Sequence, residues 1–557
     1  MAYIHVKDAT QGNIGPASDV IVSDANGVVL ARFTSMRFSE FEATRNTKDD
    51  VDSLVHSIAW PPARLSETPY TFEHVVLFDH EEAIERYGLE LEGRGISTSI
   101  LTSPSGLAPV QTSTSLANAE QDCEMLFDIV KAVASQGLDA RIFVLTHGAL
   151  SGSSASGLAN GALVGLSRII AAEQPNIWGA LIDNEADAFP FQAVKYVQNA
   201  DIVKVEDSVA RAARLRSMPA TRIVSRPQFD VRSESTYLIT GGLGALGLEV
   251  ADFLLEKGAR RLVLVSRRKL PPRRQWSAAD ELSYKLDAFD LPSAEGVVHA
   301  AGVIEDQLVL STTPSTFNRV LAPKIRGALA LHSLFPPASL SFFVLFSSCG
   351  QLFGFPGQAS YAAGNAFLDT LAEHRRAQGD NALALQYTSW RGMGLAASSE
   401  ASADFIEADL ESKGITSVSK EEALKAWEHA AKFDLAHGVV LRCRELEHDE
   451  QLAMDIIEDV AVRKAAPSLS CSPNGSSNTS PAATTQPANS VPPPGPERSK
   501  YLLDSITDCV ALVLQLDASD VDSKPALPDL GMDSVMTVAS RKELQKTLGV
   551  KVPPTLV

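Results

Sequence analysis

The sequence predicts an α/β protein with two halves, each a parallel sheet flanked by helices, followed by a short helical domain. Three observations lead to this prediction. A strand-like run at 236–240 passes through a glycine-rich turn into a helix that ends near Glu256. An α/β pattern also recurs from about 50 to 230. Finally, an amphipathic run at 500–516 predicts a helix near the carboxyl end. With 557 residues, the chain has room for roughly three to four domains.

The first 38 residues predict strands without a core of their own. Two β-like runs, 20–23 and 28–33, are joined by Asp24-Ala-Asn-Gly27. An Asn-Gly pair between strand-like runs is a hairpin signal. We therefore expect this segment to contain a hairpin.

The segment 50–230 predicts an α/β half that lacks catalytic residue types. It has apolar strands at 75–78 and 142–145, and the first runs into Asp79-His80-Glu81 with no glycine turn. Aligning 143–145 with 343–345 without gaps places Gly148, Gly161 and Gly165 opposite Ser348, Tyr361 and Asn365. We expect this half to have a structural role.

The segment 235–460 begins with a dinucleotide-binding signature. Strand 236–240 ends in Thr240 and opens into a turn that contains Gly241, Gly242, Gly244 and Gly247. Such glycines let the backbone approach a pyrophosphate, and the free amides at the helix N-terminus face the anion. The sequence therefore predicts a Rossmann-like half with these five residues at the cofactor.

A second strand, 261–265, favours NADPH over NADH. It ends in Ser266, Arg267 and Arg268, where a doubly wound sheet places the cofactor ribose. Guanidinium groups bind phosphate bidentately and so suit a 2′-phosphate. A solvated basic surface would explain the composition equally well, and the position after the second strand favours the phosphate.

A catalytic set follows on the predicted helix 359–373 and on the strand before it. An apolar strand delivers Ser348 at its carboxyl end, thirteen residues before Tyr361, and Asn365 lies one helical turn further. A carbonyl that accepts a hydride needs a proton, and a tyrosine can supply it if a cation lowers its pKa. Lys324 is the candidate cation. Ser348 would hydrogen-bond the substrate oxygen, and Asn365 would hold a water or orient Lys324.

The order of these residues resembles the ketoreductases of polyketide and fatty acid synthases. In ordinary short-chain dehydrogenases the lysine follows the tyrosine by four residues, whereas here Asn365 stands there and Lys324 lies upstream. The segments 296–303, 317–324 and 357–369 are similar to that group. More narrowly, 388–392 and 438–442 resemble fungal 6-methylsalicylic acid synthase-like, partially reducing iterative polyketide synthases. The resemblance covers nearly the whole chain.

The resemblance implies an NADPH-dependent reduction of a carrier-bound β-ketoacyl thioester by residues 235–460. It makes 50–230 the structural ketoreductase subdomain and adds Ala300, Ala301 and Gly302 as cofactor contacts. Residues 1–38 resemble the last strands of a hotdog dehydratase or thioester hydrolase-like domain. The implied partners are upstream ketosynthase, acyltransferase and dehydratase-like domains.

The carboxyl end resembles an acyl carrier domain at 499–557. It follows a linker at 466–498 that is rich in Ser, Pro, Asn and Thr. Leu530-Gly-Met-Asp-Ser534-Val535 opens a predicted helix; as a lone serine, Ser534 would be an ordinary N-cap. By resemblance, Ser534 carries 4′-phosphopantetheine attached by a phosphopantetheinyl transferase. We expect the carrier bundle to be incomplete at Val557.

One segment is shorter than the fold requires. Only 27 residues separate Arg268 from Gly296, whereas the route from the second to the fourth strand should contain two crossovers of about thirty residues each. We expect a strand and a helix to be missing after Trp276. The alternatives to a working reductase are a catalytically inactive remnant or scaffold, and a free-standing reductase of small ketones. The carrier motif argues against the free-standing enzyme.

Composition excludes several other classes. A net charge of −19 disfavours nonspecific nucleic-acid binding. The five cysteines have no metal-binding spacing and an odd count, so we expect no metal site and a reducing compartment. No signal-like region opens the chain, and no run is expected to reach the roughly 20 apolar residues of a membrane helix. These features predict a cytoplasmic protein.

Overall fold

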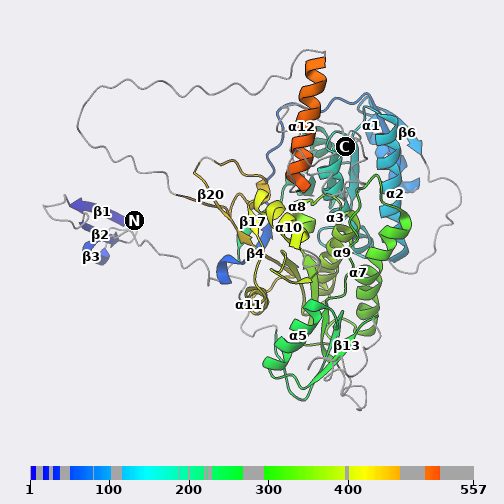
Figure 1. Cartoon of the computed structure of the whole chain (residues 1–557). Coiled ribbons are helices and arrows are strands. Elements are labelled where there is room, and N and C mark those ends of the chain that lie inside the picture. Colours follow the sequence, from blue (N-terminus) through cyan, green and yellow to red (C-terminus); the bar gives the residue numbers. More distant parts are fainter. Residues whose placement is uncertain are drawn as a thin grey trace. The chain divides into compact units, whose positions relative to one another are not determined.

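The computed structural model describes residues 2–7, 17–23, 29–37, 51–78, 81–101, 116–267, 294–394, 400–464 and 496–514, with gaps at 153, 187, 198–200, 219–222, 224–228 and 449 (Figure 1). These residues fall into two compact units, 1–50 and 51–557. Each unit is described by itself.

The first unit is a three-stranded antiparallel sheet. Its strands β1 (Ala2–Lys7), β2 (Ala17–Ser23) and β3 (Val29–Arg37) lie in chain order. The predicted hairpin is confirmed, since Val22 pairs with Ala31 across β2 and β3. Strand β1 was not predicted, although Ile4 and Val6 alternate with polar residues.

The second unit is built on an eight-stranded sheet in the order β11-β4-β18-β16-β15-β14-β12-β13. Six of these strands run parallel: β12 (Thr236–Thr240), β13 (Arg261–Val265), β14 (Ala294–His299), β15 (Phe342–Ser348), β16 (Ala382–Tyr387) and β18 (His437–Val440). The strand before the glycine turn, β12, lies between β13 and β14. This is the Rossmann order, so the predicted fold of this half is confirmed.

Two strands from the range assigned to the structural half extend this sheet. Strand β4 (Val55–Ala59) pairs antiparallel with β18, with Val55 opposite Val440. Strand β11 (Arg214–Ser217) then pairs with β4. The two halves therefore share the large sheet, which the division of the sequence near residue 235 did not anticipate.

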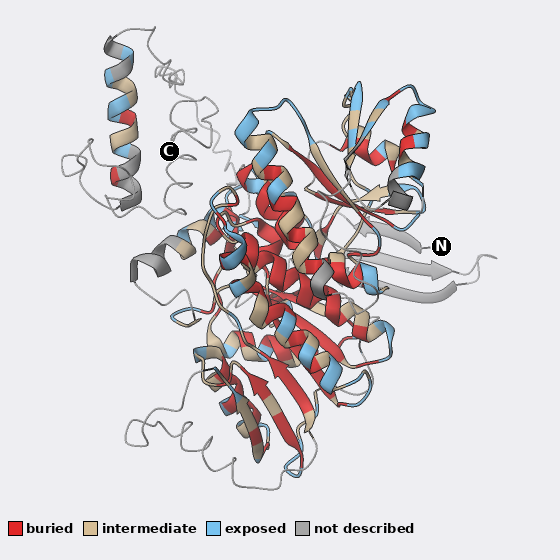
Figure 2. Cartoon of the chain, turned by 90° about the vertical axis from the view of Figure 1, so that its right-hand side faces the viewer, coloured by how far each residue is buried: buried red, intermediate tan, exposed pale blue. Residues whose placement is uncertain are grey.

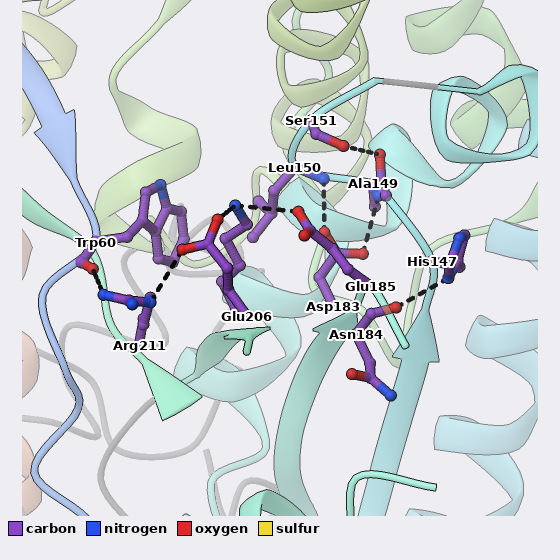
Figure 3. A network of polar contacts seen from close by, with 12 residues as sticks. Trp60, His147, Ala149, Leu150, Ser151, Asp183, Asn184, Glu185, Glu206 and Arg211 are labelled. Carbon is purple, nitrogen blue, oxygen red and sulfur yellow. Dashed lines mark hydrogen bonds and ion pairs between the residues drawn. The ribbon is translucent and has the colours of Figure 1, made fainter. Parts of the chain in front are cut away.

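The structural half has a sheet of its own in the order β10-β9-β8-β7. Its strands are β7 (Ile142–Thr146), β8 (Trp178–Asn184), β9 (Ile202–Glu206) and β10 (Val209–Arg211), and β5 (His74–Phe78) pairs separately with β6 (Ser97–Leu101). At the carboxyl end of β8, the buried Asp183 accepts hydrogen bonds from the amides of Ala149 and Leu150 (Figure 3). Nearby, Arg211 bridges Glu206 and the carbonyl of Trp60.

A layer of four long helices lies between the two sheets. They are α2 (Leu116–Gln136), α3 (Ala155–Glu173), α7 (Pro314–Leu334) and α9 (Ala359–Ala377). Helix α3 packs on β8 and on α9, and α9 packs on β15 and β16. The buried residues of this layer form one hydrophobic cluster that spans both halves (Figure 2). The predicted halves are therefore fused through a common core.

Helices α5 (Ala245–Glu256) and α11 (Lys420–Ala430) form a second hydrophobic cluster with residues of the eight-stranded sheet. The remaining elements are α1 (Glu81–Glu92), α4 (Phe191–Tyr196), α8 (Gly350–Phe353), α10 (Glu400–Ser412), α12 (Pro496–Leu514), β17 (Ile415–Thr416), β19 (Arg442–Cys443), β20 (Glu445–Leu446), β21 (Val462–Arg463), and the 3₁₀ turns 51–53 and 455–457. The helix predicted at 500–516 is present, and it begins at Pro496. The rest of the predicted carrier domain, from 515, lies outside the described residues.

Helix α3 corrects one expectation about membranes. With 19 residues and a mean hydropathy of 1.3, it is long and apolar enough to span a bilayer. However, 72% of this stretch is buried inside the protein. The apolar character of α3 is explained by its place between a sheet and α9, as in the core helix of a globular protein.

Glycines let α3 and α9 approach closely. A Cβ added at Gly165 would lie 2.1 Å from the carbonyl oxygen of Ala362, and one at Gly161 would lie 2.5 Å from Oγ1 of Thr370. In the ungapped alignment, these glycines correspond to Asn365 and Tyr361. If the first residues of α3 and α9 are aligned instead, the register shifts by one helical turn. Gly157 and Gly161 then stand opposite Tyr361 and Asn365, so both positions are again glycines. The glycines that replace catalytic residue types thus serve helix packing.

Strand β13 has no partner on its outer side among the strands that the structure describes. Val265 at its end is 45% exposed. The segment 268–293, where the shortening is predicted, lies outside the described residues.

The α3–α9 contact predicts a position-specific effect of a single methyl group. Gly165→Ala should destabilise the protein by about 1–3 kcal/mol, because backbone atoms of α9 would have to move. Gly88→Ala in α1 is the control: its Cβ would meet only ordinary contacts at 3.8 Å, and a helical Gly-to-Ala change is favourable by up to about 1 kcal/mol. Urea denaturation of both variants measures the difference. Equal midpoints would contradict the packing role.

Candidate functional site

The glycine turn between β12 and α5 fits a bound pyrophosphate. Gly241 has a φ of +71°, and a Cβ there would lie 2.8 Å from the carbonyl oxygen of Ala300. A Cβ at Gly247 would lie 2.3 Å from the carbonyl oxygen of Gly241. Gly244 is the N-cap of α5 and provides no side-chain cap, so the amides of the first helical turn stay available for an anion.

The described residues that were predicted to contact the cofactor follow the carboxyl ends of three adjacent strands. Gly242 donates its amide to Val265 at the end of β13 over 3.2 Å. The amide of Ala300, after β14, donates to Thr240 at the end of β12 over 3.1 Å. Ser266 and the exposed Arg267 come directly after β13, and Ala301 and Gly302 follow Ala300. Arg268 lies outside the described residues.

A buried pair that the sequence did not predict supports the base of this turn. Oγ1 of Thr240 and Nδ1 of His299 are 2.7 Å apart, and the two residues are direct partners across β12 and β14. Burial, with a contribution from the charge of Lys324, lowers the pKa of His299 to about 3. The imidazole is therefore neutral at physiological pH. The parallel register of the two strands was the signal that could have revealed the pair.

Lys324 is a residue of α7, and its side chain contacts β15 and α9. Its side chain is buried, and Nζ donates to the carbonyl oxygen of Phe346 over 2.7 Å. Nζ also lies 5.6 Å from the centre of the Tyr361 ring. The lysine stem passes close to Gly364, where a Cβ would lie 3.0 Å from that of Lys324. The structure thus places the predicted cation beside the predicted acid.

The buried side chains of Lys324 and Asp369 influence each other's charge beside Tyr361. Burial lowers the pKa of Lys324 to about 8, and the charge of Asp369 opposes this change. Burial likewise raises the pKa of Asp369 to about 8, and its carboxylate accepts a hydrogen bond of 3.0 Å from Nε2 of Gln351. Because each charge offsets part of the burial cost of the other, the two groups titrate together.

Asp369 was not predicted from the sequence, although a signal was present. It lies four residues after Asn365 and eight after Tyr361 on α9, so all three lie on one helix face.

Tyr361, Ser348 and Asn365 meet where β15 ends and α9 begins. Burial raises the pKa of Tyr361, while hydrogen bonding to Asn365 and Ser348 lowers it. Oγ of Ser348 accepts the amide of Gly350 over 3.1 Å, and the same side chain is hydrogen-bonded to Tyr361.

Asn365 is fully buried and is held mainly by backbone groups. Its Nδ2 donates to the carbonyl oxygen of Tyr361 over 2.9 Å, and its own carbonyl oxygen accepts from Oγ of Ser347 over 3.2 Å. Oδ1 has no hydrogen-bond partner among the described residues. The structure shows no hydrogen bond between the described side chains of Asn365 and Lys324, so direct orientation of the lysine by this amide remains a prediction.

Other predicted sites fall outside what the structure describes. Ser534 lies beyond the last described residue. Within the described ranges, no group of three or more His, Cys, Asp or Glu side chains could hold a metal ion.

Two protein-family models match this chain. A ketoreductase (KR) domain model matches residues 235–288 and 277–392. A model described as a phosphopantetheine attachment site matches residues 504–557.

Curated fungal proteins align with the whole chain. A 6-methylsalicylic acid synthase of Aspergillus terreus is 46% identical over 623 positions, which cover 100% of this chain and 34% of the relative. A mellein synthase of Phaeosphaeria nodorum is 42% identical over 620 positions, with the same coverage. The chain thus spans about a third of the length of the relatives it matches. Both alignments exceed 557 positions, so the relatives contain residues that this chain lacks.

Solved ketoreductases share the fold. An A-type ketoreductase from a modular polyketide synthase is 25% identical, with a TM-score of 0.57 over 71% of this chain and 94% of that chain. A ketoreductase from the first module of phoslactomycin biosynthesis is 27% identical, with a TM-score of 0.53 over 70% and 93% of the two chains.

The buried lysine predicts a stability effect whose size depends on pH. Between pH 8 and 10.5 the unfolded chain binds the Lys324 proton more readily than the folded chain, so stability rises with pH across this range. Below pH 8 the full cost applies, on the order of 3 kcal/mol. Lys324→Met should therefore raise the free energy of unfolding at pH 7, less about 1 kcal/mol for the lost hydrogen bond and less the attraction to Asp369 that the variant loses.

Urea denaturation at pH 7 and pH 10 checks this expectation, with the exposed Lys432→Met as the control. The gain should shrink at pH 10. A loss of stability that is equal at both pH values would show that Lys324 carries no burial cost.

Proposed function

The chain belongs to the polyketide synthases similar to fungal 6-methylsalicylic acid synthase, of which it matches the ketoreductase and acyl carrier region, and we propose that it reduces a carrier-bound β-ketoacyl thioester with NADPH. One observation carries the proposal. Ser348, Tyr361 and Lys324 converge from β15, α9 and α7 at the sheet edge that also bears the glycine turn. We further propose that this step takes place in the cytoplasm.

The residues of the site divide the reaction between them. Bound NADPH would supply a hydride to the ketone carbon, which is the β-carbon of the acyl thioester. Ser348 donates a hydrogen bond from its hydroxyl to the ketone oxygen and so stabilises the charge that develops there. Tyr361 is protonated at neutral pH because burial raises its pKa, and it gives its proton to the same oxygen.

Lys324 makes the proton transfer possible. Its ammonium group, close to the Tyr361 ring, stabilises the phenolate left after transfer. Asn365 completes the site: its buried Oδ1 faces no partner among the described residues, which supports the proposal that it holds a water molecule. That water would return a proton to Tyr361.

The substrate would arrive on the carrier segment. The phosphopantetheine attachment model, which covers 504–557, supports Ser534 as the modified serine. The relatives include both a 6-methylsalicylic acid synthase and a mellein synthase. We therefore assign the substrate by class, a β-ketoacyl thioester, within an aromatic polyketide pathway of the 6-methylsalicylic acid type. Ketosynthase, acyltransferase and dehydratase-like domains would supply and process that chain.

A second candidate is a ketoreductase that has lost activity through the shortened segment. It is favoured by two observations. The KR model matches in two separate pieces, which overlap at 277–288, and the alignments with relatives are longer than the chain. Both observations support the proposal that a strand and a helix after Trp276 are missing. Fluorescence titration with NADPH discriminates between the candidates, with a version carrying the segment from a relative as the comparison.

The acid role of Tyr361 predicts a specific kinetic defect. Tyr361→Phe should lower turnover of a model β-ketoacyl thioester by at least 100-fold, because removal of a positioned general acid commonly costs two to four powers of ten. NADPH binding should be unchanged, since the phenol lies outside the glycine turn. Turnover that persists in the variant would exclude Tyr361 as the proton donor, and absence of NADPH binding in both proteins would favour the inactive candidate.

The carrier role predicts a covalent modification. Incubation with coenzyme A and a broad-specificity phosphopantetheinyl transferase should increase the mass of the chain by one phosphopantetheine group. Ser534→Ala should prevent the increase, whereas Ser523→Ala, in the same segment, should not. A modified Ser534→Ala chain would place the attachment at another residue, and an unmodified parent chain would show that this segment does not act as a carrier.

A further inference from the structure

A buried carboxylate of the structural half binds two loops of the catalytic half. Glu173 is the last residue of α3, and its side chain is only 2% exposed. Its Oε1 accepts the amide of Gly357 over 2.8 Å, and its Oε2 accepts the amide of Val309 over 2.7 Å. One side chain thus connects two segments that are 136 and 184 residues away in the chain.

These two loops border the proposed catalytic site. Gly357 lies four residues before Tyr361, and α9 begins at Ala359. The loop that holds Val309 follows β14 and contains Asp306, whose charge acts on Tyr361. The loops also bind one another, because the amide of Gln307 donates to the carbonyl oxygen of Gly357 over 2.8 Å. Glu173 therefore connects the loop after β14 to the residues that lead into α9, the helix that carries Tyr361.

The energetics argue against a role in packing alone. A buried carboxylate is costly unless its oxygens are hydrogen-bonded. Glu173 also stands at the C-terminal end of α3, where the helix dipole disfavours negative charge. A neutral residue of similar volume would fill this space without either cost. What only the carboxylate supplies is two strong acceptors for two amides at once.

We propose that Glu173 is a positioning residue for the ketoreductase, and that it fixes the start of α9 so that the Tyr361 hydroxyl meets the substrate oxygen. The proposal rests on the proposed function and adds to it a residue from the half without catalytic residue types. The glycine turn of the cofactor site lies on other strands. Loss of Glu173 should therefore reduce turnover and leave NADPH binding intact.

The test uses two matched changes from a carboxylate to an amide. Glu173→Gln keeps the size of the side chain but turns one acceptor into a donor, which then opposes Val309 or Gly357. Asp183→Asn is the control. Asp183 is fully buried and also accepts two backbone amides, from Ala149 and Leu150 at 2.9 and 3.0 Å, but all its partners lie in the structural half (Figure 3).

Both variants should lose stability in urea, and only one should lose catalysis. At a temperature where both are folded, kcat of Glu173→Gln should fall at least tenfold, since small misplacements of reacting groups cost up to about a hundredfold. Its affinity for NADPH should match the parent. If Glu173→Gln fails to fold, Glu173→Asp, which keeps the charge and shortens the reach, takes its place. Equal kcat values in the two variants would overturn the proposal.

Hydrogen exchange separates this proposal from the proposed function. In Glu173→Gln, the amides of Val309 and of 357–361 should exchange faster than in the parent chain, and in Asp183→Asn they should not. If the parent chain reduces no β-ketone, the proposed function fails, and exchange at these amides still decides whether Glu173 holds the loops. Unchanged exchange in Glu173→Gln would overturn the positioning role in either case.

Discussion

The contact between α3 and α9 is the constraint on which the rest of the structure depends. Helix α9 carries Tyr361 and Asn365, and its backbone at Ala362 lies so close to Gly165 of α3 that no side chain fits between them. The position of α9 is thus set by a helix from the other half. This explains why a half without catalytic residue types is joined to the catalytic one through a common core and a shared sheet. Without α3, one face of α9 would be exposed and its first turn would have no fixed support.

The same tight core determines the electrostatics of the site. In the proposed reaction a cation is needed beside Tyr361, and Lys324 lies there among buried groups, where a charge is disfavoured. The pKa of Lys324 falls for this reason, and Asp369 and the carbonyl oxygen of Phe346 keep the ammonium form accessible. Burial of the Lys324 ammonium group therefore lowers the stability of the core, and it places a positive charge beside the proposed proton donor. Such local instability is expected where chemistry, rather than packing, selects a residue.

The sequence was sufficient for features with a local signal and insufficient for features made by distant partners. Strands β12 and β13 and helices α5 and α9 were predicted within a few residues, because apolar runs, glycine turns and helical spacing are local. The pairing of β4 with β18 was not predicted, since Val55 and Val440 are far apart in the chain and antiparallel pairing leaves no mark on either strand. No role was predicted for Glu173, because its partners are backbone amides, which every residue has. The roles of Arg268 and Ser534 stay predictions.

The predicted shortening after Trp276 should affect cofactor binding more than proton donation. Lys324, Ser348 and Tyr361 come from α7, β15 and α9, all on the side of β12 away from β13, and their described hydrogen bonds and ring contact lie within these elements and α8. The ribose end of the cofactor site, in contrast, begins at Ser266 and Arg267, directly before that segment. A missing strand beyond β13 would therefore weaken cofactor binding and leave the proton-donating groups in place. Cofactor affinity and proton transfer are thus expected to be separable in this chain, because the α3–α9 core that positions Tyr361 does not extend to the edge where the strand and helix are predicted to be missing.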